Sequence, residues 1–487
     1  MSTYTSKADE MSHDTNRSSG SGPSTTGPGK TQYSFIEFIE DLDNYCPGGY
    51  HPLTIGDALN GGRYQLVDKL GYGGYSTIWL ARDLRMDRYV ALKAITADAS
   101  SSTPEASLMH YLGNSPSTPG RGIIPPLLDE FWVTGSNGKH KCIVTPPAQM
   151  SLSDAKEAST CCLFPPKVAQ SIIAQLIRGV AFLHSNDIVH GADLDFFQDL
   201  HLGNILVQFP ESIDRYSTSE LYEKFGEPES EAVVRLDGMP LPNGIPEHVF
   251  IPGWFGVRGN EITLGKDRIF LSDLGESFNP YKTPRSFSRT LPLLQPPEAR
   301  FSDEPLSFPS DIWTLACTIF EIFGQRPLFD AFWATADRVT AEHVELLGML
   351  PTEWWKNWDK RSEWFNEEGE VGGAARSHDT VRKTWNMRFG YSIQKPRAEA
   401  GMEVVTESES REFEAMIRSM LTFRPGDRAT AQQVLHSEWM KGWGQPALEE
   451  SESILHTAAK AAPAAEAPLD EDACSGRAGP EAKSGST

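Results

Sequence analysis

"VHGADLDFFQDLHLGNILV", residues 189–207, is the most informative stretch of this sequence. Asp199 and Asn204 stand at a D-x-x-x-x-N spacing directly before the strand-like run "NILV". A carboxylate and an amide at this spacing can flank a metal-bound phosphate, one accepting a hydroxyl proton and the other ligating Mg²⁺. Asp193 and Asp195 have no asparagine five residues on, so Asp199 is the predicted base.

A second carboxylate and a lysine complete the pattern. "IFLSDLGES" places Asp273 at the end of a strand-like run, followed by Leu and Gly, which is a setting for a metal-binding carboxylate. Upstream, "VALK" places Lys93 within an apolar strand, where an ammonium could reach phosphate oxygens. A lysine in such a strand needs a partner carboxylate, and Glu105 in "TPEASLMHYL" is the first candidate.

A glycine-rich turn precedes this lysine. "LGYGGYSTIWLARD" places Gly71, Gly73 and Gly74 between two strand-like runs, and Ser76 stands where a G-x-G-x-x-G pattern has its third glycine. Glycines there let backbone N–H groups approach phosphate oxygens without interference from a Cβ. An ordinary glycine-rich hairpin fits the turn alone equally well. The specificity comes from the chain order in which the turn is followed by Lys93, Asp199, Asn204 and Asp273.

Composition limits the class of protein. The 487 residues carry a net charge of −22, which argues against sequence-independent nucleic-acid binding and favours cationic partners. The six cysteines include no C-x-x-C pair, as expected for reduced thiols inside a cell. The N-terminus lacks the apolar region of a signal peptide, and no apolar run is long enough to span a bilayer. We therefore expect a soluble protein of the cytoplasm or the nucleus, without direct nucleic-acid or membrane contacts.

The chain divides into segments of different character. Residues 1–31 and 446–487 are low in complexity and are predicted to be disordered tails. Residues 32–147 contain short strand-like runs broken by turns, whereas 148–445 are mainly helical in pattern. Strands followed by helices predict an α+β protein with two lobes of unlike class. An insertion at about 208–268 is far longer than usual loops of about 4–6 residues.

With these motifs the sequence resembles the eukaryotic protein kinases, and specifically the SR-protein kinases, from about residue 40 to 441. The resemblance is carried by "EDLDNYCPGGYHPLTIGDALNGGRYQLVDKLGYGGYSTIWLARD", by "DLG" in place of D-F-G, by "PPEARF" and by "HVELLG". It implies a two-lobed kinase fold and a monomeric serine/threonine protein kinase that uses ATP and Mg²⁺. The implied substrates are basic, Arg/Ser-rich proteins.

The resemblance also implies a role for each site residue. The turn from Gly71 to Ser76 would cover the phosphates of ATP, and Lys93 would hold them with Glu105 as its ion-pair partner. Asp199 would be the catalytic base, and Asn204 and Asp273 would bind Mg²⁺. In "HKCIVTPPAQM", Thr145 would be the gatekeeper before a hinge in which Pro146 supplies a carbonyl and Ala148 an N–H. The other residues implied to contact the nucleotide are Leu70, Ile78 and Ala91.

Several residues depart from the family pattern. Gly191 replaces the arginine that usually follows His190, so activity should not require phosphorylation of the activation loop. His201 replaces a lysine, and the resulting "HGxDLHxGN" pattern resembles phosphotransferases that modify aminoglycosides. A small-molecule phosphotransferase and a catalytically impaired scaffold are therefore the alternatives to a protein kinase. Residues 192–198 are either a true insertion or translated intron.

Three further contacts are predicted in the helical region. Glu298 and Arg428 are expected to form a buried ion pair that holds the fold. Glu345 matches an acidic substrate-docking position of the family, but Arg338 stands where a second acid is expected, which weakens the inference to Arg-rich substrates. A tryptophan cluster is expected to serve helical packing; its members are Trp354, Trp355, Trp358 and Trp364.

Overall fold

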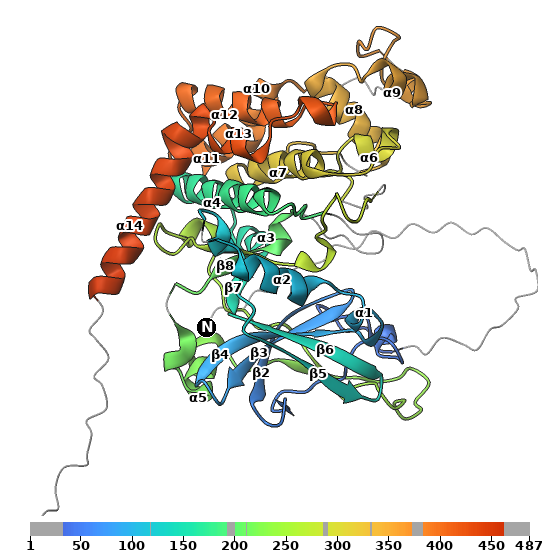
Figure 1. Cartoon of the computed structure of the whole chain (residues 1–487), viewed down its shortest axis with the longest axis vertical. Coiled ribbons are helices and arrows are strands. Elements are labelled where there is room, and N and C mark those ends of the chain that lie inside the picture. Colours follow the sequence, from blue (N-terminus) through green and yellow to red (C-terminus); the bar gives the residue numbers. More distant parts are fainter. Residues whose placement is uncertain are drawn as a thin grey trace, which may run out of the picture.

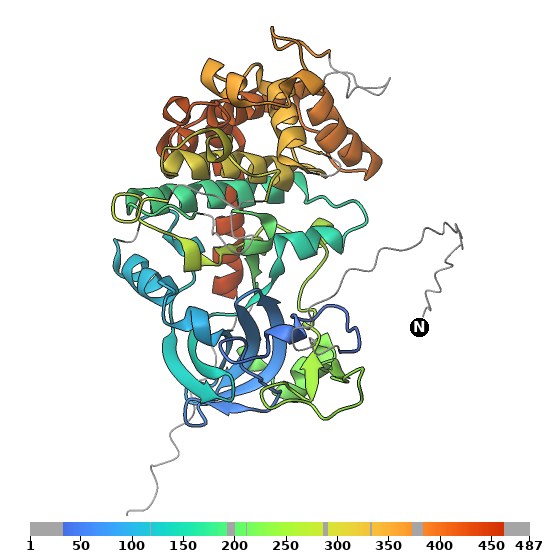
Figure 2. The ribbon, with the colours of Figure 1, turned by 90° about the vertical axis from the view of Figure 1, so that its right-hand side faces the viewer.

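The computed structural model describes residues 33–116, 118–191, 200–210, 212–285, 291–331, 334–372 and 383–461. They form a strand-rich lobe and a mainly helical lobe, stacked along the long axis of the molecule (Figures 1 and 2). The predicted α+β class with two unlike lobes is therefore confirmed. We refer to residues 33–147 as the N-lobe and to the helical part that follows as the C-lobe.

The N-lobe is built on a six-stranded antiparallel sheet with strand order β1-β2-β3-β4-β6-β5. In β3, Trp79 and Ala81 belong to one buried cluster and Leu80 to another, as the two-residue period of a strand requires. Both faces of the sheet are therefore covered. Its strands are β1 (Ala58–Leu59), β2 (Tyr64–Gly73), β3 (Ser76–Asp83), β4 (Arg88–Ile95), β5 (Asp129–Gly135) and β6 (Gly138–Thr145). Helices α1 (Ala97–Ser100) and α2 (Glu105–Asn114) connect β4 to β5.

The C-lobe surrounds two long helices, α4 (Pro166–Ser185) and α7 (Phe308–Phe323). Helix α4 begins with Pro166, where a missing N–H costs no intrahelical bond. Apolar residues that repeat at three- and four-residue spacing along one face of this helix are all buried: Val168, Ile172, Leu176, Val180 and Leu183. A small sheet, ordered β11-β8-β7, faces the N-lobe; its strands are β7 (Ala148–Ser151), β8 (Ile205–Gln208) and β11 (Ile269–Leu271). The other helices are α3 (Leu152–Glu157), α6 (Glu298–Phe301), α8 (Ala336–Leu347), α9 (Thr352–Asn357), α10 (Trp385–Phe389), α11 (Lys395–Glu399), α12 (Glu407–Met420) and α13 (Ala431–Leu435).

The expectation of a disordered tail from residue 446 is wrong for its first part. Helix α14 (Gln445–Ala461) continues the fold and packs against α4 (Figure 1). Ala447, Leu448 and Ser451 are buried on one helical face, and Ser451 also donates a hydrogen bond to Asp267. The alanine-rich composition that suggested disorder also suits a helix, and here tertiary contacts stabilise it. Residues 1–31 and 462–487 lie outside the described residues.

The long insertion, 208–268, leaves the C-lobe and covers the outer face of the N-lobe sheet (Figure 2). It contains α5 (Thr218–Phe225), β9 (Ser230–Ala232) and β10 (His248–Phe250). The backbone N–H of Tyr89 donates to Asp214 Oδ1 at 2.6 Å, and the hydroxyl of Tyr222 donates to the carbonyl of Val67 at 2.6 Å. The shared apolar cluster comprises Val67, Leu80, Tyr89, Ile213, Leu221 and Phe255.

The leading segment, residues 33–57, is fixed between the sheet and the insertion. Glu40 forms an ion pair with Lys69 of β2, and both side chains are buried. Asn137, in the turn between β5 and β6, donates from Nδ2 to the carbonyl of Tyr50 at 2.8 Å and to a carbonyl of the insertion at 2.8 Å. The leading segment and the insertion therefore form one structural unit with the N-lobe.

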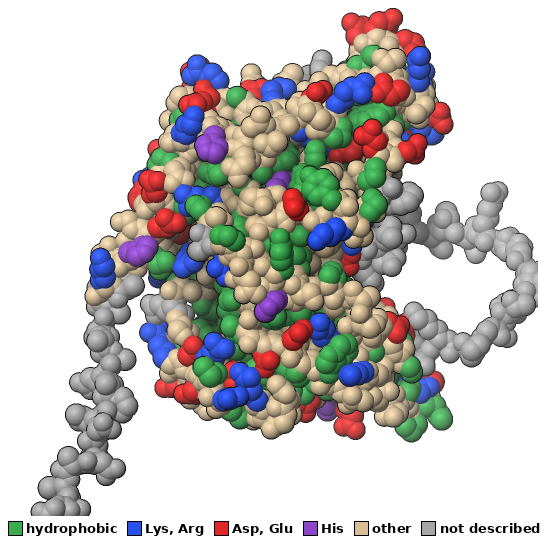
Figure 3. Space-filling view, in the orientation of Figure 1, with side chains coloured by type: hydrophobic (Ala, Val, Ile, Leu, Met, Phe, Trp, Pro, Cys, Tyr) green, Lys and Arg blue, Asp and Glu red, His purple; other side chains and the backbone are tan. Residues whose placement is uncertain are grey.

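The surface carries charges of both signs. On the face shown in Figure 3, acidic and basic side chains lie interspersed over both lobes. Among the residues that the structure describes, none of the helices combines the length and the apolar composition needed to cross a bilayer. Within the same residues the cysteines are free thiols, as expected, at positions 46, 142, 161, 162 and 317; Cys474 lies outside them.

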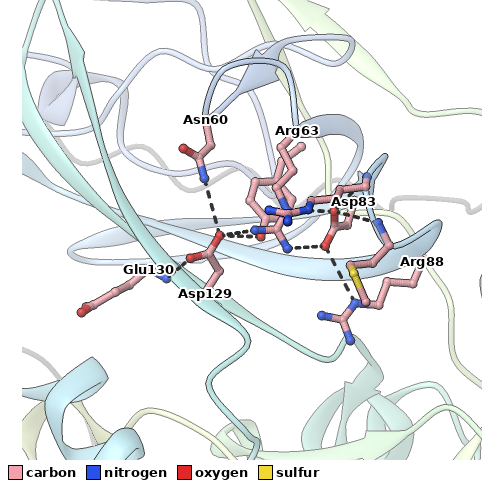
Figure 4. Close-up of polar contacts among 9 residues, drawn as sticks. Asn60, Arg63, Asp83, Arg88, Asp129 and Glu130 are labelled. Atoms are coloured by element: carbon pink, nitrogen blue, oxygen red, sulfur yellow. Dashed lines mark hydrogen bonds and ion pairs between the residues drawn. The ribbon is translucent and has the colours of Figure 1, made fainter.

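A charged network fastens one end of the N-lobe sheet (Figure 4). Arg63 lies between two carboxylates, with Nη2 2.8 Å from Asp83 Oδ2 and Nη1 2.8 Å from Asp129 Oδ2. Asp129 Oδ2 also accepts a hydrogen bond from the Tyr64 hydroxyl at 2.7 Å. Because these residues belong to β2, β3 and β5 or adjoin them, the network joins strands that are not neighbours in the sheet.

Two predicted packing features of the C-lobe are confirmed. Arg428 Nη1 and Nη2 lie 2.7 Å and 2.5 Å from the two carboxylate oxygens of Glu298, and both residues are buried. The tryptophan cluster is a satellite core in which Trp354, Trp355 and Trp358 are buried and Trp364 packs against them. These residues hold the fold together.

Candidate active site

A cleft of about 520 Å³ lies between the two sheets. It is lined by the glycine-rich turn, by β3, β4 and α2, by the connection from β6 to β7, and by the ends of β8 and β11. Gly74 is absent from its lining. The predicted site residues that do line it are Leu70, Gly71, Gly73, Ser76, Ile78, Ala91, Lys93, Glu105, Thr145, Ala148, Asn204 and Asp273.

Lys93 is the centre of the charged groups in this cleft. It lies in β4 between Ile78 of β3 and Ile143 of β6, which fixes its backbone. Its Nζ is 2.7 Å from Glu105 Oε2, so the expected ion pair is present, and 3.2 Å from Asp273 Oδ1. Burial disfavours the charge of Lys93, but the two carboxylates outweigh burial and raise its pKa well above the ordinary value. The lysine is therefore cationic at neutral pH.

The two predicted metal ligands stand at adjacent strand ends. β8 and β11 are antiparallel, with Ile205 opposite Leu271, so Asn204 and Asp273 lie just beyond this pair. The backbone N–H of Ser272 donates to the carbonyl of Asn204 at 2.8 Å and links the two ends. Asp273 adopts a left-handed backbone conformation, with φ 62° and ψ 56°, which is uncommon for a residue other than glycine and typical of functional sites.

This donor set fits Mg²⁺. Magnesium prefers oxygen ligands and is usually bound by one or two carboxylates together with substrate phosphates and water. Asp273 supplies a carboxylate and Asn204 an amide oxygen, both at the lining of the cleft. Among the described residues no group of three or more His, Cys, Asp or Glu is arranged to hold a metal by itself. The cleft therefore suits a metal that arrives with a phosphate ligand.

Asp199, the predicted base, lies outside the described residues together with 192–198. The backbone on either side of them is held in the core. The N–H groups of His190 and Gly191 donate to Asp311 at 2.8 Å and 3.2 Å, and the Thr318 hydroxyl donates to the carbonyl of Leu200. The extra residues therefore do not pull His190 out of the core.

The hinge has the predicted limits. Strand β6 ends at Thr145 and β7 begins at Ala148, so Pro146 and Pro147 form the connection between the lobes. Proline lacks a donor but retains its carbonyl, which leaves Pro146 able to accept a hydrogen bond in this position. The assignments of Pro146 and Ala148 to adenine binding stay predictions.

Sequence reasoning missed Tyr75 of the glycine-rich turn. Its hydroxyl donates to Asp273 Oδ1 and lies 3.3 Å from Lys93 Nζ. Burial raises the pKa of Tyr75 well above its ordinary value, and the nearby Asp273 adds to this effect, so the phenol keeps its proton. The sequence of the turn contains an aromatic residue at this position, but a turn has no hydrophobic periodicity that would indicate whether the side chain points inward.

The expected acidic docking position is not a free carboxylate. The Oε2 atom of Glu345 lies 3.7 Å from Arg388 Nη2, and it accepts the N–H of Lys383 at 3.5 Å. The neighbouring Glu342 is bound by the same two basic residues, at 2.6 Å from Arg388 Nη1 and 3.2 Å from Lys383 Nζ. A basic substrate would have to compete with these internal cations.

Comparisons with known proteins agree with this geometry. Residues 264–440 match the protein kinase domain family. A serine/threonine protein kinase of Aspergillus fumigatus is 24% identical over 409 residues, which cover 82% of this chain and 90% of that protein. The kinase SRPK of Physarum polycephalum is 25% identical over 435 residues, covering 82% of this chain and 91% of the relative. Human SRSF protein kinase 3 is 38% identical over 156 residues, which cover 31% of this chain and 27% of the human protein.

The chain is similar to the SR-protein kinases and to other serine/threonine protein kinases. It is a serine/threonine protein kinase, as predicted, and its substrates are proteins. Protein kinases in general use ATP and Mg²⁺. In SR-protein kinases, as in other protein kinases, there is little covalent chemistry for the protein to perform, so catalysis depends on positioning and on electrostatic stabilisation.

Proposed function

We propose that this kinase transfers the γ-phosphoryl group of ATP to serine or threonine hydroxyls of basic, Arg/Ser-rich proteins, with Mg²⁺ as cofactor. The observation that carries the proposal is the convergence of Lys93, Glu105 and Asp273 in one cleft beneath the glycine-rich turn. A fixed cation beside a carboxylate suits a ligand that brings both phosphate oxygens and a divalent metal.

Each residue has a role in this proposal. Lys93 binds phosphate oxygens, and Glu105 keeps the ammonium oriented. Asp273 and Asn204 hold Mg²⁺, which when bound neutralises charge on the transferring phosphoryl group. Asp199 accepts the proton of the substrate hydroxyl. That last assignment rests on the sequence spacing alone.

The preference for basic substrates is supported by the net charge of −22 and by the name of the human relative, SRSF protein kinase 3. Glu342 and Glu345 are already paired with internal cations. The attraction of a basic peptide is therefore better supported by the long-range electrostatic field of the protein's net negative charge than by these two side chains. We place the enzyme in the cytoplasm or nucleus, as a monomer without direct nucleic-acid contacts.

The test is Mg²⁺-dependent transfer from radiolabelled ATP to an Arg/Ser-repeat peptide. Lys93→Met deletes the charge and keeps the apolar stem, so transfer should be lost while circular dichroism stays unchanged. Asp273→Asn should likewise abolish metal-dependent transfer. The matched control is Lys139→Met, which removes an exposed lysine from β6 and should leave the rate unchanged.

Wild-type rates in the Lys93 variant would overturn the nucleotide site. Transfer to an aminoglycoside but not to the peptide would instead support a small-molecule phosphotransferase. A wild-type protein that modifies neither acceptor would be evidence for a scaffold. Equal rates on peptides with and without arginine would defeat the proposed substrate preference.

A further inference from the structure

The side chain of Tyr75 lines the cleft and contacts both groups assigned to phosphate and metal. Its hydroxyl contacts Asp273 Oδ1, and its ring centroid is 5.0 Å from Lys93 Nζ. The hydroxyl also reaches the segment after Asp273, since a Cβ built on Gly275 would lie 3.2 Å from it. Tyr75 therefore connects the glycine-rich turn directly to the predicted metal ligand.

The Tyr75 hydroxyl contacts the two groups that a bound nucleotide would need, the ammonium of Lys93 and the carboxylate of Asp273. Asp273 Oδ1 accepts the Tyr75 hydroxyl and also lies 3.2 Å from Lys93 Nζ, so the two charged groups are bridged directly and through the phenol. A metal-bound triphosphate must come between Lys93 and Asp273 to meet both. Phosphates that bind Lys93 and a metal that binds Asp273 would therefore compete with the phenol for the same two partners.

We propose that Tyr75 is an internal competitor of the nucleotide: its phenol closes the phosphate site, and it must swing out before ATP with Mg²⁺ binds. This inference rests on the proposed function, because it takes Lys93 and Asp273 as the phosphate and metal ligands.

The turn is built to allow this movement. On one side, the Tyr50 hydroxyl donates to the carbonyl of Gly73 at 2.7 Å. On the other side, Ser76 is buried at the start of β3, where it pairs with Ile95 of β4. Between these anchors lie only Gly74 and Tyr75. The carbonyl of Tyr75 accepts a hydrogen bond from the N–H of Thr96 at 2.8 Å, so its backbone is held and the side chain would move by rotation about its own bonds. Tyr75 can therefore leave the cleft without displacing β2 or β3.

Competition of this kind reduces apparent affinity. If only a fraction of molecules has the phenol outside the cleft, the apparent dissociation constant for ATP is the intrinsic value divided by that fraction. Tyr75→Phe removes the hydroxyl contacts with Asp273 and Lys93 but keeps the ring, so the open fraction should rise. We expect ATP with Mg²⁺ to bind about tenfold more tightly, in line with the loss of one charge-assisted hydrogen bond. Tyr75→Ser, which removes the ring as well, should bind at least as tightly.

Adenosine separates this role from a general effect on the cleft. It carries no phosphate, so it does not need the space between Lys93 and Asp273, and its affinity should not change in either variant. A structural change of the cleft would shift the affinity for adenosine together with that for ATP. The matched control is Tyr111→Phe in α2, outside the lining of the cleft; this side chain is 52% exposed, and the variant should bind both ligands like the wild type.

The experiment is titration calorimetry of the full chain with ATP and Mg²⁺ and, separately, with adenosine. Tighter ATP binding by the Tyr75 variants, with unchanged adenosine binding, supports the inference. ATP binding that is unchanged or weaker in Tyr75→Phe and Tyr75→Ser overturns it and leaves the nucleotide site intact. If neither the wild type nor any Tyr75 variant binds ATP, the proposed function itself fails, and the inference fails with it.

Discussion

Removing Arg428 should destabilise the C-lobe strongly, because its guanidinium serves several buried acceptors. Besides the two oxygens of Glu298, it donates to the carbonyls of Thr422 at 2.8 Å, Pro309 at 2.8 Å and Phe423 at 3.1 Å. It therefore joins the start of α6 to the start of α7 and to the loop that follows α12.

Arg428→Met keeps the apolar stem but leaves the Glu298 carboxylate buried. Among the side chains that the structure describes, the Ser310 hydroxyl, at 3.1 Å, is then the one remaining donor to it. Breaking one side of a buried ion pair typically costs about 3–5 kcal/mol, and we expect a loss of that size in the free energy of unfolding. Glu298→Gln should cost less, because the guanidinium keeps its three carbonyl acceptors.

The assay is equilibrium urea unfolding of the wild type, both single variants and the double variant, followed by fluorescence and by circular dichroism. Each single variant loses the shared ion pair, so adding the two single losses in the free energy of unfolding counts that pair twice. The loss in the double variant should therefore be smaller than their sum by about 2 kcal/mol. A loss below about 1 kcal/mol for Arg428→Met would refute the reasoning. Strict additivity of the two single losses would refute it equally.

Three other changes test separate features. Burial raises the pKa of Asp68 from 3.8 to about 6, so the protonated carboxyl stabilises the folded state fully below pH 3.8, and this stabilisation is lost as pH rises through 6. Asp68→Asn should therefore raise the free energy of unfolding by about 1–3 kcal/mol at pH 7.5 and by less at pH 5. Urea unfolding at both pH values measures the difference. Ending the chain after Gly444 removes α14 and exposes its contacts with α4, so the melting temperature should fall by several degrees, whereas ending it after residue 461 should not change it. Deleting 192–198 should preserve or raise kinase activity, because the flanking backbone is already anchored, while Asp199→Ala should abolish activity. If the deletion variant and Asp193→Ala are both inactive, the extra residues belong to the active site.

Several site residues could be predicted because the local sequence around each one fixes its position in a strand or helix. Lys93 and Glu105 could be paired from sequence because a lysine in an apolar strand needs a carboxylate, and α2 supplies one at its first residue. Asp273 and Asn204 follow from their positions at strand ends. The inward orientation of Tyr75 could not be predicted, because the rotation of a glycine-rich turn is set by contacts with distant residues.

Two features of the fold escaped prediction for the same physical reason. The composition of 446–461 suits either a free tail or a helix, and contacts with α4 and with Asp267 decide between them. The path of 208–268 is likewise set by apolar partners in another lobe, among them Leu80 and Tyr89. Helix α14 and the path of 208–268 both depend on tertiary packing, which local composition and periodicity do not predict.

The two ends of the insertion lie side by side in the C-lobe, against which its last residues, among them Ile262 and Asp267, also pack. Val207 pairs with Ile269, and the N–H of Gln208 donates to the carbonyl of Arg268 at 2.8 Å, so its two ends form the mouth of a hairpin. A tight turn could take its place without moving β8 or β11, and an ancestor could have acquired the segment in one step. The N-lobe would then have had to change with it: Val67 and Leu80 are apolar because the insertion covers them, and relatives that lack the segment should carry polar side chains at these positions.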